Sequence, residues 1–354
     1  MCNPTAEAVH ARLRASLGKF LPEEKLLELI PAAQKYPFAI SGYWADVMRE
    51  GDPLWRQCVP DTRELTASPA GESIDPLAED RFSPLPGLIH RYPDRVLVLA
   101  AMQCAGYCRF CTRRRLVGRA GMQAASPGDV FVYLGAHTEV RDVLLSGGDP
   151  MTLPIAELRH WLETLKRLPQ LALIRIGTRL PSFAPAAISE ELCASLAPFA
   201  PLYVNTHFNH PAEITTEAQA ACARMRRAGL ILANQSVLLC GVNDDAAILR
   251  RLGYALLGMG VRPYYLHTMD RITGTAHFRV PLARAAEIWD ALAATTSGMA
   301  IPRLMLDLPG GGGKMQYMAS RLLSRQNAEK EIRYIFRNIE NGESVYIESP
   351  EMEA

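Results

Sequence analysis

The stretch Val96-Leu-Val-Leu-Ala-Ala-Met102, followed after one residue by Cys104-Ala-Gly-Tyr-Cys108-Arg-Phe-Cys111, decides the fold of this chain. The first part has the length and apolar composition of a strand buried on both faces. The cysteines follow in one loop with C-x3-C-x2-C spacing, which suits three irons of a cubane iron–sulfur cluster. Electron-transfer [4Fe–4S] sites use four cysteines. A three-cysteine site therefore predicts one iron that is open for chemistry.

The cysteine loop allows two other interpretations. A structural zinc site normally has four Cys or His ligands with paired spacings, and no fourth ligand follows at such a spacing. The cysteines could also be unligated loop residues. The eight cysteines of the chain are too unevenly scattered for a disulfide framework. A reducing, cytoplasmic location is expected, which an oxygen-sensitive cluster would need.

Composition sets further bounds. The chain has 354 residues, of which 49% are hydrophobic, and a net charge of +1. That length supports one large domain or two smaller ones. The near-neutral charge favours neither a nucleic-acid partner nor an anionic membrane surface. The first residues lack a secretory signal, and no apolar run reaches membrane-spanning length.

The rest of the chain predicts an α/β fold. Residues 1–90 are expected to form a helical N-terminal region with proline-rich punctuation over 69–93. Short apolar runs then alternate with amphipathic segments, which indicates a parallel α/β architecture. The expected strands are 96–102, 142–146, 172–177, 202–206, 231–237, 263–268 and 303–307, and the expected helices include 155–167, 188–197, 216–228 and 245–259. The motifs follow predicted strands, and βα barrels have their active sites at the C-terminal ends of the strands.

A glycine run is the second strong signal. In Asp307-Leu-Pro-Gly-Gly-Gly-Gly-Lys314, four consecutive glycines let the backbone approach a ligand and point amides at an anion. The lysine suggests phosphate binding or a Schiff base. The run is not a Walker A loop, because Met315 follows the lysine. A flexible hinge is the alternative for such a run taken alone.

Together, several long motifs in fixed order between about residues 35 and 335 resemble the lysine 2,3-aminomutase family. Besides the cysteine loop and the glycine run, they are Gly87-Leu-Ile-His-Arg-Tyr-Pro-Asp-Arg95, Cys111-Thr-Arg-Arg-Arg115, Asp142-Val-Leu-Leu-Ser-Gly-Gly-Asp-Pro150, Asn205-Thr-His-Phe-Asn-His-Pro211, Asn234-Gln-Ser-Val-Leu-Leu239, Arg262-Pro-Tyr-Tyr265 and His277-Phe278.

The resemblance implies a partial (β/α)6-type TIM barrel over 91–314, with the helical region 1–90 and a C-terminal extension, 315–354, covering its mouth. It implies three cofactors: a [4Fe–4S] cluster, S-adenosyl-L-methionine (SAM) and pyridoxal 5′-phosphate (PLP).

The same resemblance assigns cofactor-binding roles. Cys104, Cys108 and Cys111 would hold the cluster, and Lys314 would be the catalytic lysine that holds PLP. Arg95 would clamp the PLP phosphate, a role that suits a guanidinium fork, with Tyr92 beside it. The residues implied for SAM are Ser146, Gly147, Gly148, Asp149, His207 and Gln235.

For the substrate, the resemblance implies that Arg113 receives the carboxylate and that Asp270 and Asp307 bind the distal amino group of lysine. Two carboxylates that converge in a partly buried pocket need a cation to offset their repulsion. Glutamate is therefore disfavoured as a substrate, whereas arginine is not, because a guanidinium also pairs with carboxylates.

Two departures from the family pattern affect the expectations. Clostridial-type members end in a cysteine-rich, zinc-binding tail; here the chain stops at Ala354 without it, and Asp245 matches the barrel cysteine that completes that site. No such zinc is expected, so the sequence does not predict oligomer contacts linked by it. Tyr264-Tyr-Leu-His267 and Thr275-Ala-His-Phe278 resemble the branch that modifies elongation factor P, but that branch usually lacks the glycine run.

We therefore expect a radical SAM, PLP-dependent isomerase that converts L-lysine to L-β-lysine. The alternatives are an aminomutase acting on a lysine of elongation factor P or on another cationic amino acid such as arginine, and a non-catalytic iron–sulfur protein. The expected partners are a small amino acid and an electron donor such as flavodoxin or ferredoxin, in a homo-oligomer.

Overall fold

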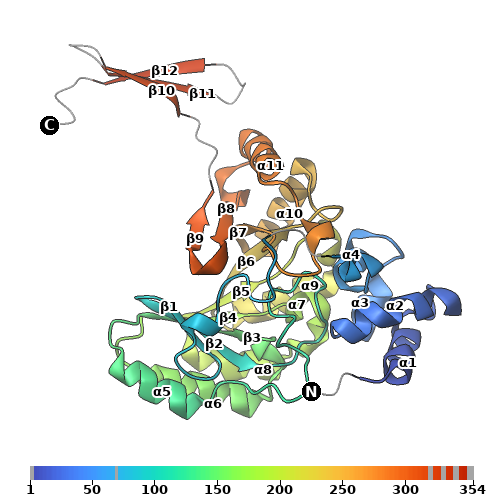
Figure 1. Cartoon of the computed structure of the whole chain (residues 1–354). Coiled ribbons are helices and arrows are strands. Elements are labelled where there is room, and N and C mark those ends of the chain that lie inside the picture. Colours follow the sequence, from blue (N-terminus) through green and yellow to red (C-terminus); the bar gives the residue numbers. More distant parts are fainter. Residues whose placement is uncertain (1–3, 68–70, 318–321, 328–331, 338–342, 349–354) are drawn as a thin grey trace.

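The protein is built around a curled sheet of nine strands in the order β1-β2-β3-β4-β5-β6-β7-β8-β9 (Figure 1). A computed structural model describes residues 4–67, 71–317, 322–327, 332–337 and 343–348. Strands β2 to β8 run parallel, whereas β1 and β9 pair antiparallel at the two edges. This is the predicted partial α/β barrel, with six crossover connections between seven parallel strands.

The strands of this sheet are β1 Leu88–Tyr92, β2 Arg95–Ala101, β3 Asp142–Gly147, β4 Leu173–Gly177, β5 Leu202–Thr206, β6 Leu230–Leu238, β7 Arg262–Thr268, β8 Arg303–Leu308 and β9 Gly313–Gln316. The helices are α1 Ala6–Leu17, α2 Glu23–Lys35, α3 Gly42–Val47, α4 Pro53–Cys58, α5 Pro127–Ala136, α6 Ile155–Lys166, α7 Leu180–Phe183, α8 Glu190–Leu196, α9 Thr216–Arg227, α10 Ala246–Gly258 and α11 Leu282–Thr295.

The barrel core forms because apolar side chains of the parallel strands and of the crossover helices meet between them. Val98, Leu145 and Val204 of the strands are fully buried, as are Leu158 of α6 and Ala221 of α9. Their burial stabilises the barrel through the removal of apolar surface from water. All seven predicted parallel strands and the four predicted helices are confirmed, with ends that differ by three residues or fewer.

Polar residues set the ends of several helices. Asp245 accepts hydrogen bonds from the backbone N–H groups of Ala247 and Ile248. It therefore caps the N-terminus of α10, which satisfies backbone donors that a helix leaves unpaired.

The two edge strands were not predicted. β1 lies in the proline-rich segment, and β9 begins within the glycine run, so the sheet spans Leu88–Gln316 and extends slightly beyond 91–314. The backbone N–H of Lys314 in β9 donates to the Tyr92 hydroxyl in β1 over 2.8 Å. This bond joins the two edges of the curled sheet at one point.

The helical N-terminal region has its own core, which includes Leu13, Leu17 and Trp44. It docks on the cysteine loop through backbone bonds from Tyr107 N–H to the Ala39 carbonyl and from Arg109 N–H to the Gln57 carbonyl. Arg109 is itself buried and forms an ion pair with buried Glu64, which also pairs with Arg114. The N-terminal region thus fixes the loop that carries the cysteines.

Residues 71–83, here called the strap, cross the mouth of the barrel. Ser73 bridges to Ile272 in the loop after β7, and the N–H of Gly310 donates to the Pro76 carbonyl over 2.9 Å. The strap lies at the end of the expected N-terminal region, so that region contributes to covering the mouth.

The extension differs from the expectation. It forms an antiparallel sheet of β10 Leu322–Asn327, β11 Ile332–Arg337 and β12 Glu343–Glu348, which Figure 1 shows apart from the barrel mouth. Leu323 and Val345 on this sheet are exposed.

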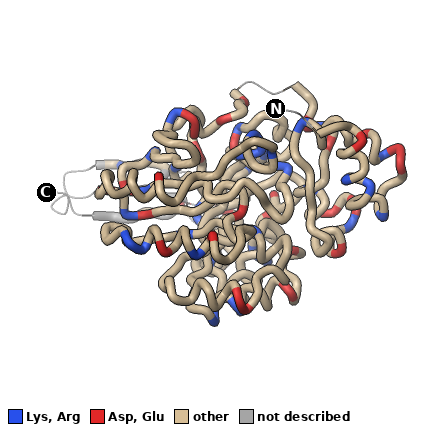
Figure 2. Tube along the Cα trace, turned by 90° about the horizontal axis from the view of Figure 1, so that it is seen from below, with Lys and Arg blue, Asp and Glu red and all other residues tan. Residues whose placement is uncertain are grey.

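Two surface properties complete the fold. Basic and acidic residues are interspersed along the trace in Figure 2, in keeping with the net charge of +1. Within the described ranges, no helix has the length and apolar character required to span a bilayer.

Candidate active site

A cavity of about 1140 Å³ occupies the barrel. Small-molecule sites usually measure about 300–1,000 Å³, so this cavity has room for more than one ligand. Every residue that the sequence predicted for a site lines it: Cys104, Cys108, Cys111, Lys314, Arg95, Tyr92, Ser146, Gly147, Gly148, Asp149, His207, Gln235, Arg113, Asp270 and Asp307. The fold thus gathers residues that lie up to 222 positions apart in one chain.

The three cysteines are partly exposed to this cavity. Burial, with the charge of Asp149 next in importance, raises the pKa of Cys104 well above its usual value. Burial and the neighbouring Cys108 raise the pKa of Cys111 to about 11. Since metal ligands bind as thiolates, positive charge near these sulfurs favours the ligating form.

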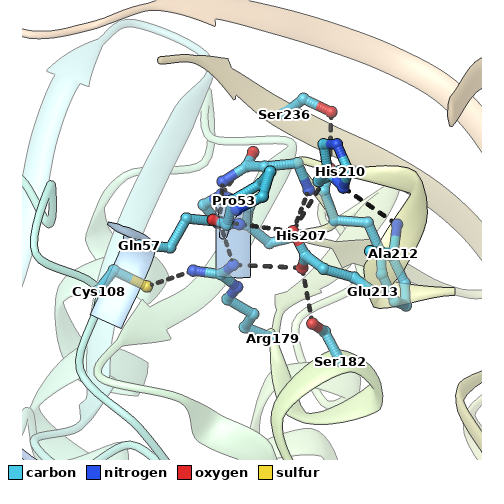
Figure 3. Close-up of polar contacts among 12 residues, drawn as sticks. Pro53, Gln57, Cys108, Arg179, Ser182, His207, His210, Ala212, Glu213 and Ser236 are labelled. Carbon is cyan, nitrogen blue, oxygen red and sulfur yellow. Dashed lines mark hydrogen bonds and ion pairs between the residues drawn. The ribbon is translucent and has the colours of Figure 1, made fainter. Parts of the chain in front are cut away.

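Arg179, which the sequence analysis missed, supplies such a charge. It follows β4, and its Nη1 lies 2.8 Å from the Sγ of Cys108 (Figure 3). Its Nη2 donates to Gln57 Oε1 over 2.5 Å and pairs with Glu213 Oε2 at 3.2 Å. Glu213 also accepts from the Ser182 hydroxyl. The buried guanidinium is therefore held from two sides, and one of its supports is Gln57 of the N-terminal region.

No three His, Cys, Asp or Glu side chains within the described part of the chain converge on a point where one metal ion could sit. A cubane cluster has several irons, so its cysteine ligands need not converge on one point. Three cysteines that line a common cavity beside a fixed guanidinium fit such a cluster.

The glycine turn after β3 packs directly on the cysteine loop. Gly147 has φ +106°, and a Cβ there would lie 2.3 Å from the Ala101 carbonyl oxygen. A Cβ on Gly148 would lie equally close to the Gln103 carbonyl oxygen. Only glycine permits this approach, which places Ser146 and the turn at the edge of the cavity.

Asp149 supports that turn. Its Oδ1 accepts from the N–H of Met151, and its Oδ2 accepts from the Thr178 hydroxyl and the N–H of Arg179 at 2.8–3.0 Å. Both oxygens are thus used within the protein, and they tie the end of β3 to the start of the Arg179 segment.

The later strands contribute His207 and Gln235. His207 follows β5, and its Nε2 lies 3.2 Å from Asn209 Oδ1. Burial and the charge of Arg179 hold the pKa of His207 well below its usual value. A neutral imidazole therefore faces the cavity. Gln235 lies on β6 and lines the same space.

At the opposite side, Lys314 forms a compact group with Asp307 and His267. Lys314 Nζ lies 3.5 Å from Asp307 Oδ2 and 3.4 Å from His267 Nε2, and His267 Nδ1 lies 3.4 Å from Asp307 Oδ2. Burial lowers the pKa of Lys314, and the carboxylates of Asp307 and Asp270 oppose this only in part. His267 was not predicted as a site residue.

The two aspartates differ in their titration. Burial, together with the charge of Asp307, raises the pKa of Asp270 to about 6. Burial also acts to raise the pKa of Asp307, but its hydrogen bond with His267 and the charge of Lys314 lower it overall. The Thr112 hydroxyl donates to Asp270 Oδ2 over 2.6 Å. Asp270 is thus a partly buried carboxyl group whose charge Lys314 and Arg113 offset only in part.

Two arginines near β1 bear on the phosphate expectation. Arg95 is partly exposed, pairs with Asp94 at 3.1 Å and stacks on the Tyr92 ring. Arg91, which the sequence analysis missed, lines the cavity with buried Nε and Nη2 atoms that have no hydrogen-bond partner. Buried polar groups normally have partners. Unpaired guanidinium donors beside Lys314 therefore fit a phosphate-bearing cofactor such as PLP.

Arg113 is the predicted carboxylate receptor. In the structure its guanidinium forms an ion pair with Glu79 of the strap at 2.6 Å, while its Nη1 lies 3.5 Å from Ser146 Oγ. The charge of Glu79 raises the pKa of Arg113 against the opposing effect of burial, so the guanidinium stays charged. Glu79 lies in a proline-rich segment and gave no recognisable signal in the sequence.

Comparison with known proteins shows a consistent relationship. A family model described as lysine-2,3-aminomutase matches residues 289–353. An L-lysine 2,3-aminomutase from Fusobacterium nucleatum is 40% identical over 93% of this chain and 77% of its own length. A glutamate 2,3-aminomutase from Clostridioides difficile is 37% identical over 82% of this chain and 70% of its own.

Among solved structures, a radical SAM methyltransferase from Sphaerobacter thermophilus covers 86% of this chain and 94% of its own, with 16% identity and a TM-score of 0.44.

Proposed function

Since the chain belongs to the lysine 2,3-aminomutase family of isomerases, we propose that it converts L-lysine to L-β-lysine by moving the amino group from C2 to C3. One observation carries the proposal: three cysteines and a partly buried lysine line one cavity together with two aspartates. A cluster, SAM, PLP and an amino acid would thus meet in one space.

When bound, a [4Fe–4S] cluster with SAM would supply radical chemistry, and PLP would supply a carbonyl group that binds amines. Cys104, Cys108 and Cys111 would hold the cluster. Ser146, Gly147, Gly148, His207 and Gln235 would form the SAM pocket, with Asp149 supporting the turn. An electron donor such as flavodoxin or ferredoxin would supply the electron.

Lys314 would hold PLP. Its lowered pKa increases the fraction of neutral amine at a given pH, and a neutral amine is the nucleophilic form. His267 Nε2, 3.4 Å from Nζ, is placed to accept a proton from it. Asp307 lies beside Nδ1 of the His267 imidazole and would stabilise the positive charge that His267 gains with the proton. Arg91 and Arg95 would bind the phosphate, with Tyr92 fixing the edge of the site.

Charge matching supports a cationic amino acid. With the Lys314 amine engaged by the cofactor, Asp270 and Asp307 would lack their nearest cation, and the ε-ammonium of lysine would restore the balance. Arg113 would bind the α-carboxylate. The side-chain carboxylate of glutamate would face two like charges, so the activity named for the C. difficile relative suits this site less well.

A substrate panel tests this proposal. Anaerobically reconstituted enzyme with SAM, PLP and dithionite would be given lysine, arginine, ornithine, glutamate and elongation factor P, with products read by mass spectrometry of derivatised amines. β-Lysine from free lysine is the expected product. Turnover of arginine only, or of elongation factor P only, would contradict the assignment to free lysine. Turnover of glutamate would contradict the charge argument.

A further inference from the structure

The strap is tied to two loops of the site. The N–H of Ser73 donates to the Arg271 carbonyl over 2.9 Å, and the N–H of Thr273 donates back to the Ser73 carbonyl over 3.0 Å. These bonds fix the strap beside Asp270. The bond from Gly310 to Pro76 fixes it beside the glycine run. Residues 71–83 thus span the mouth between segments that carry Asp270 and Lys314.

A turn in the strap directs Glu79 inward. The two carboxylate oxygens of Asp75 accept from the N–H groups of Glu79 and Asp80, each over 3.0 Å. Ala78, just before Glu79, has φ +53°, a conformation that residues other than glycine seldom adopt. Glu79 is consequently buried, with 7% of its surface exposed.

The contact between Glu79 and Arg113 uses one edge of the guanidinium. Arg113 Nε lies 3.1 and 3.2 Å from the two oxygens of Glu79, and Nη2 lies 2.6 Å from Oε1. Nη1 has only the distant Ser146 hydroxyl, at 3.5 Å. Because a guanidinium has five N–H donors in a planar fork, the edge formed by Nη1 and Nη2 keeps donors for a second carboxylate.

We propose that Glu79 is a positioning residue for substrate recognition: it holds Arg113 side-on so that the Nη1–Nη2 edge takes the α-carboxylate of the amino acid. This inference rests on the proposed function, which assigns the substrate carboxylate to Arg113. It adds that recognition of the carboxylate depends on the position of the strap across the barrel mouth, because Glu79 belongs to the strap.

The test compares two ligands that differ in one group. Cadaverine has the carbon chain and distal ammonium of lysine but no carboxylate. Binding of lysine and cadaverine to reconstituted enzyme would be measured by calorimetry for the natural chain and for Glu79→Gln. We expect the Kd for lysine to rise about 10-fold or more, the usual effect of losing a charge-assisted hydrogen bond, and the Kd for cadaverine to change less than about twofold. Glu79→Asp should recover part of the affinity for lysine.

A matched control lies one residue away. Asp80 pairs with Arg115 at 2.8 Å on the exposed side of the strap and makes no contact with Arg113. Asp80→Asn should leave both Kd values unchanged, and iron and PLP contents should equal those of the natural chain in all variants.

Three results would overturn the inference. An unchanged Kd for lysine in Glu79→Gln would show that Arg113 needs no support. Tighter lysine binding would show that Glu79 competes with the substrate. Equal losses for lysine and cadaverine would indicate a general structural role. Failure of the proposed function has a different signature, because the natural chain itself would then show no preference for lysine over cadaverine.

Discussion

The two sides of the cavity differ in how their polar groups are satisfied. On the cysteine side, Arg179, Asp149 and Glu213 form several short bonds with the protein, and the loop is anchored to the N-terminal region. Among these three side chains, the Nε of Arg179 is the one buried atom without a partner. On the lysine side, Arg91 has buried donors without partners, and Lys314 contacts Asp307 and His267 only at 3.4–3.5 Å.

This difference separates a scaffold from a binding surface. A group whose hydrogen bonds are complete within the protein is rigid and gains little from a ligand. A buried group without partners gains a great deal, because its desolvation is otherwise uncompensated. The cysteine side therefore suits a permanently bound cluster, and the lysine side suits molecules that bring their own phosphate, carboxylate or ammonium.

The largest effect is expected from breaking the cysteine side. Cys108→Ala removes the sulfur that contacts Arg179 and one of three proposed cluster ligands, so cleavage of SAM should be lost entirely. PLP should still bind, because Lys314 lies on the other side. Anaerobic assay of 5′-deoxyadenosine, with PLP content as the control, checks this. Retained SAM cleavage would remove Cys108 from the cluster.

Breaking the lysine side should give the converse result. Lys314→Ala removes the only lysine that lines the described cavity, so the visible absorbance of lysine-bound PLP should disappear while iron content stays unchanged. Absorbance spectra and iron analysis of the same preparation provide the measurement. Loss of iron together with PLP would contradict the independence of the two sides.

A smaller effect is expected from Asp270→Asn, which keeps the size of the side chain but removes its charge. Leaving a buried ammonium with one fewer carboxylate should cost about 3–5 kcal/mol, or about two to four orders of magnitude in lysine affinity. Calorimetry with lysine, and PLP content as the control, checks this. Lysine affinity within a few-fold of the natural value would exclude Asp270 from cation binding.

The smallest effect concerns pH. The pKa of Asp270 is raised to about 6, and its charged form is the one that attracts lysine. Lysine affinity should therefore fall as pH decreases through about 6. Thr112→Val should shift this fall to higher pH, because the hydroxyl of Thr112 lowers the pKa of Asp270. A pH series of Kd values tests both, and Asp270→Asn should show no such step.

The sequence predicted the parallel strands well because each is a short apolar run bounded by polar or turn residues. The residues that it predicted for a site all line one cavity, since the carboxyl ends of parallel strands meet at one edge of a sheet. Strand β9 was not predicted, because it begins in the glycine run and glycine has little preference for strands. The sequence did not predict roles for Arg179, Glu79 and Arg91, because their surroundings are formed by residues distant in sequence. Arg179 and its partner Gln57, for example, lie 122 positions apart.

The central claim is that the two sides of the cavity act on one molecule. Lysine deuterated at C3 would be given to reconstituted enzyme with unlabelled SAM, and 5′-deoxyadenosine and SAM would be examined by mass spectrometry. Deuterium in either adenosyl product, together with β-lysine, is the predicted result, because the radical formed on the cysteine side must reach the amino acid on the lysine side. Turnover of SAM with no deuterium transfer from lysine would contradict the claim.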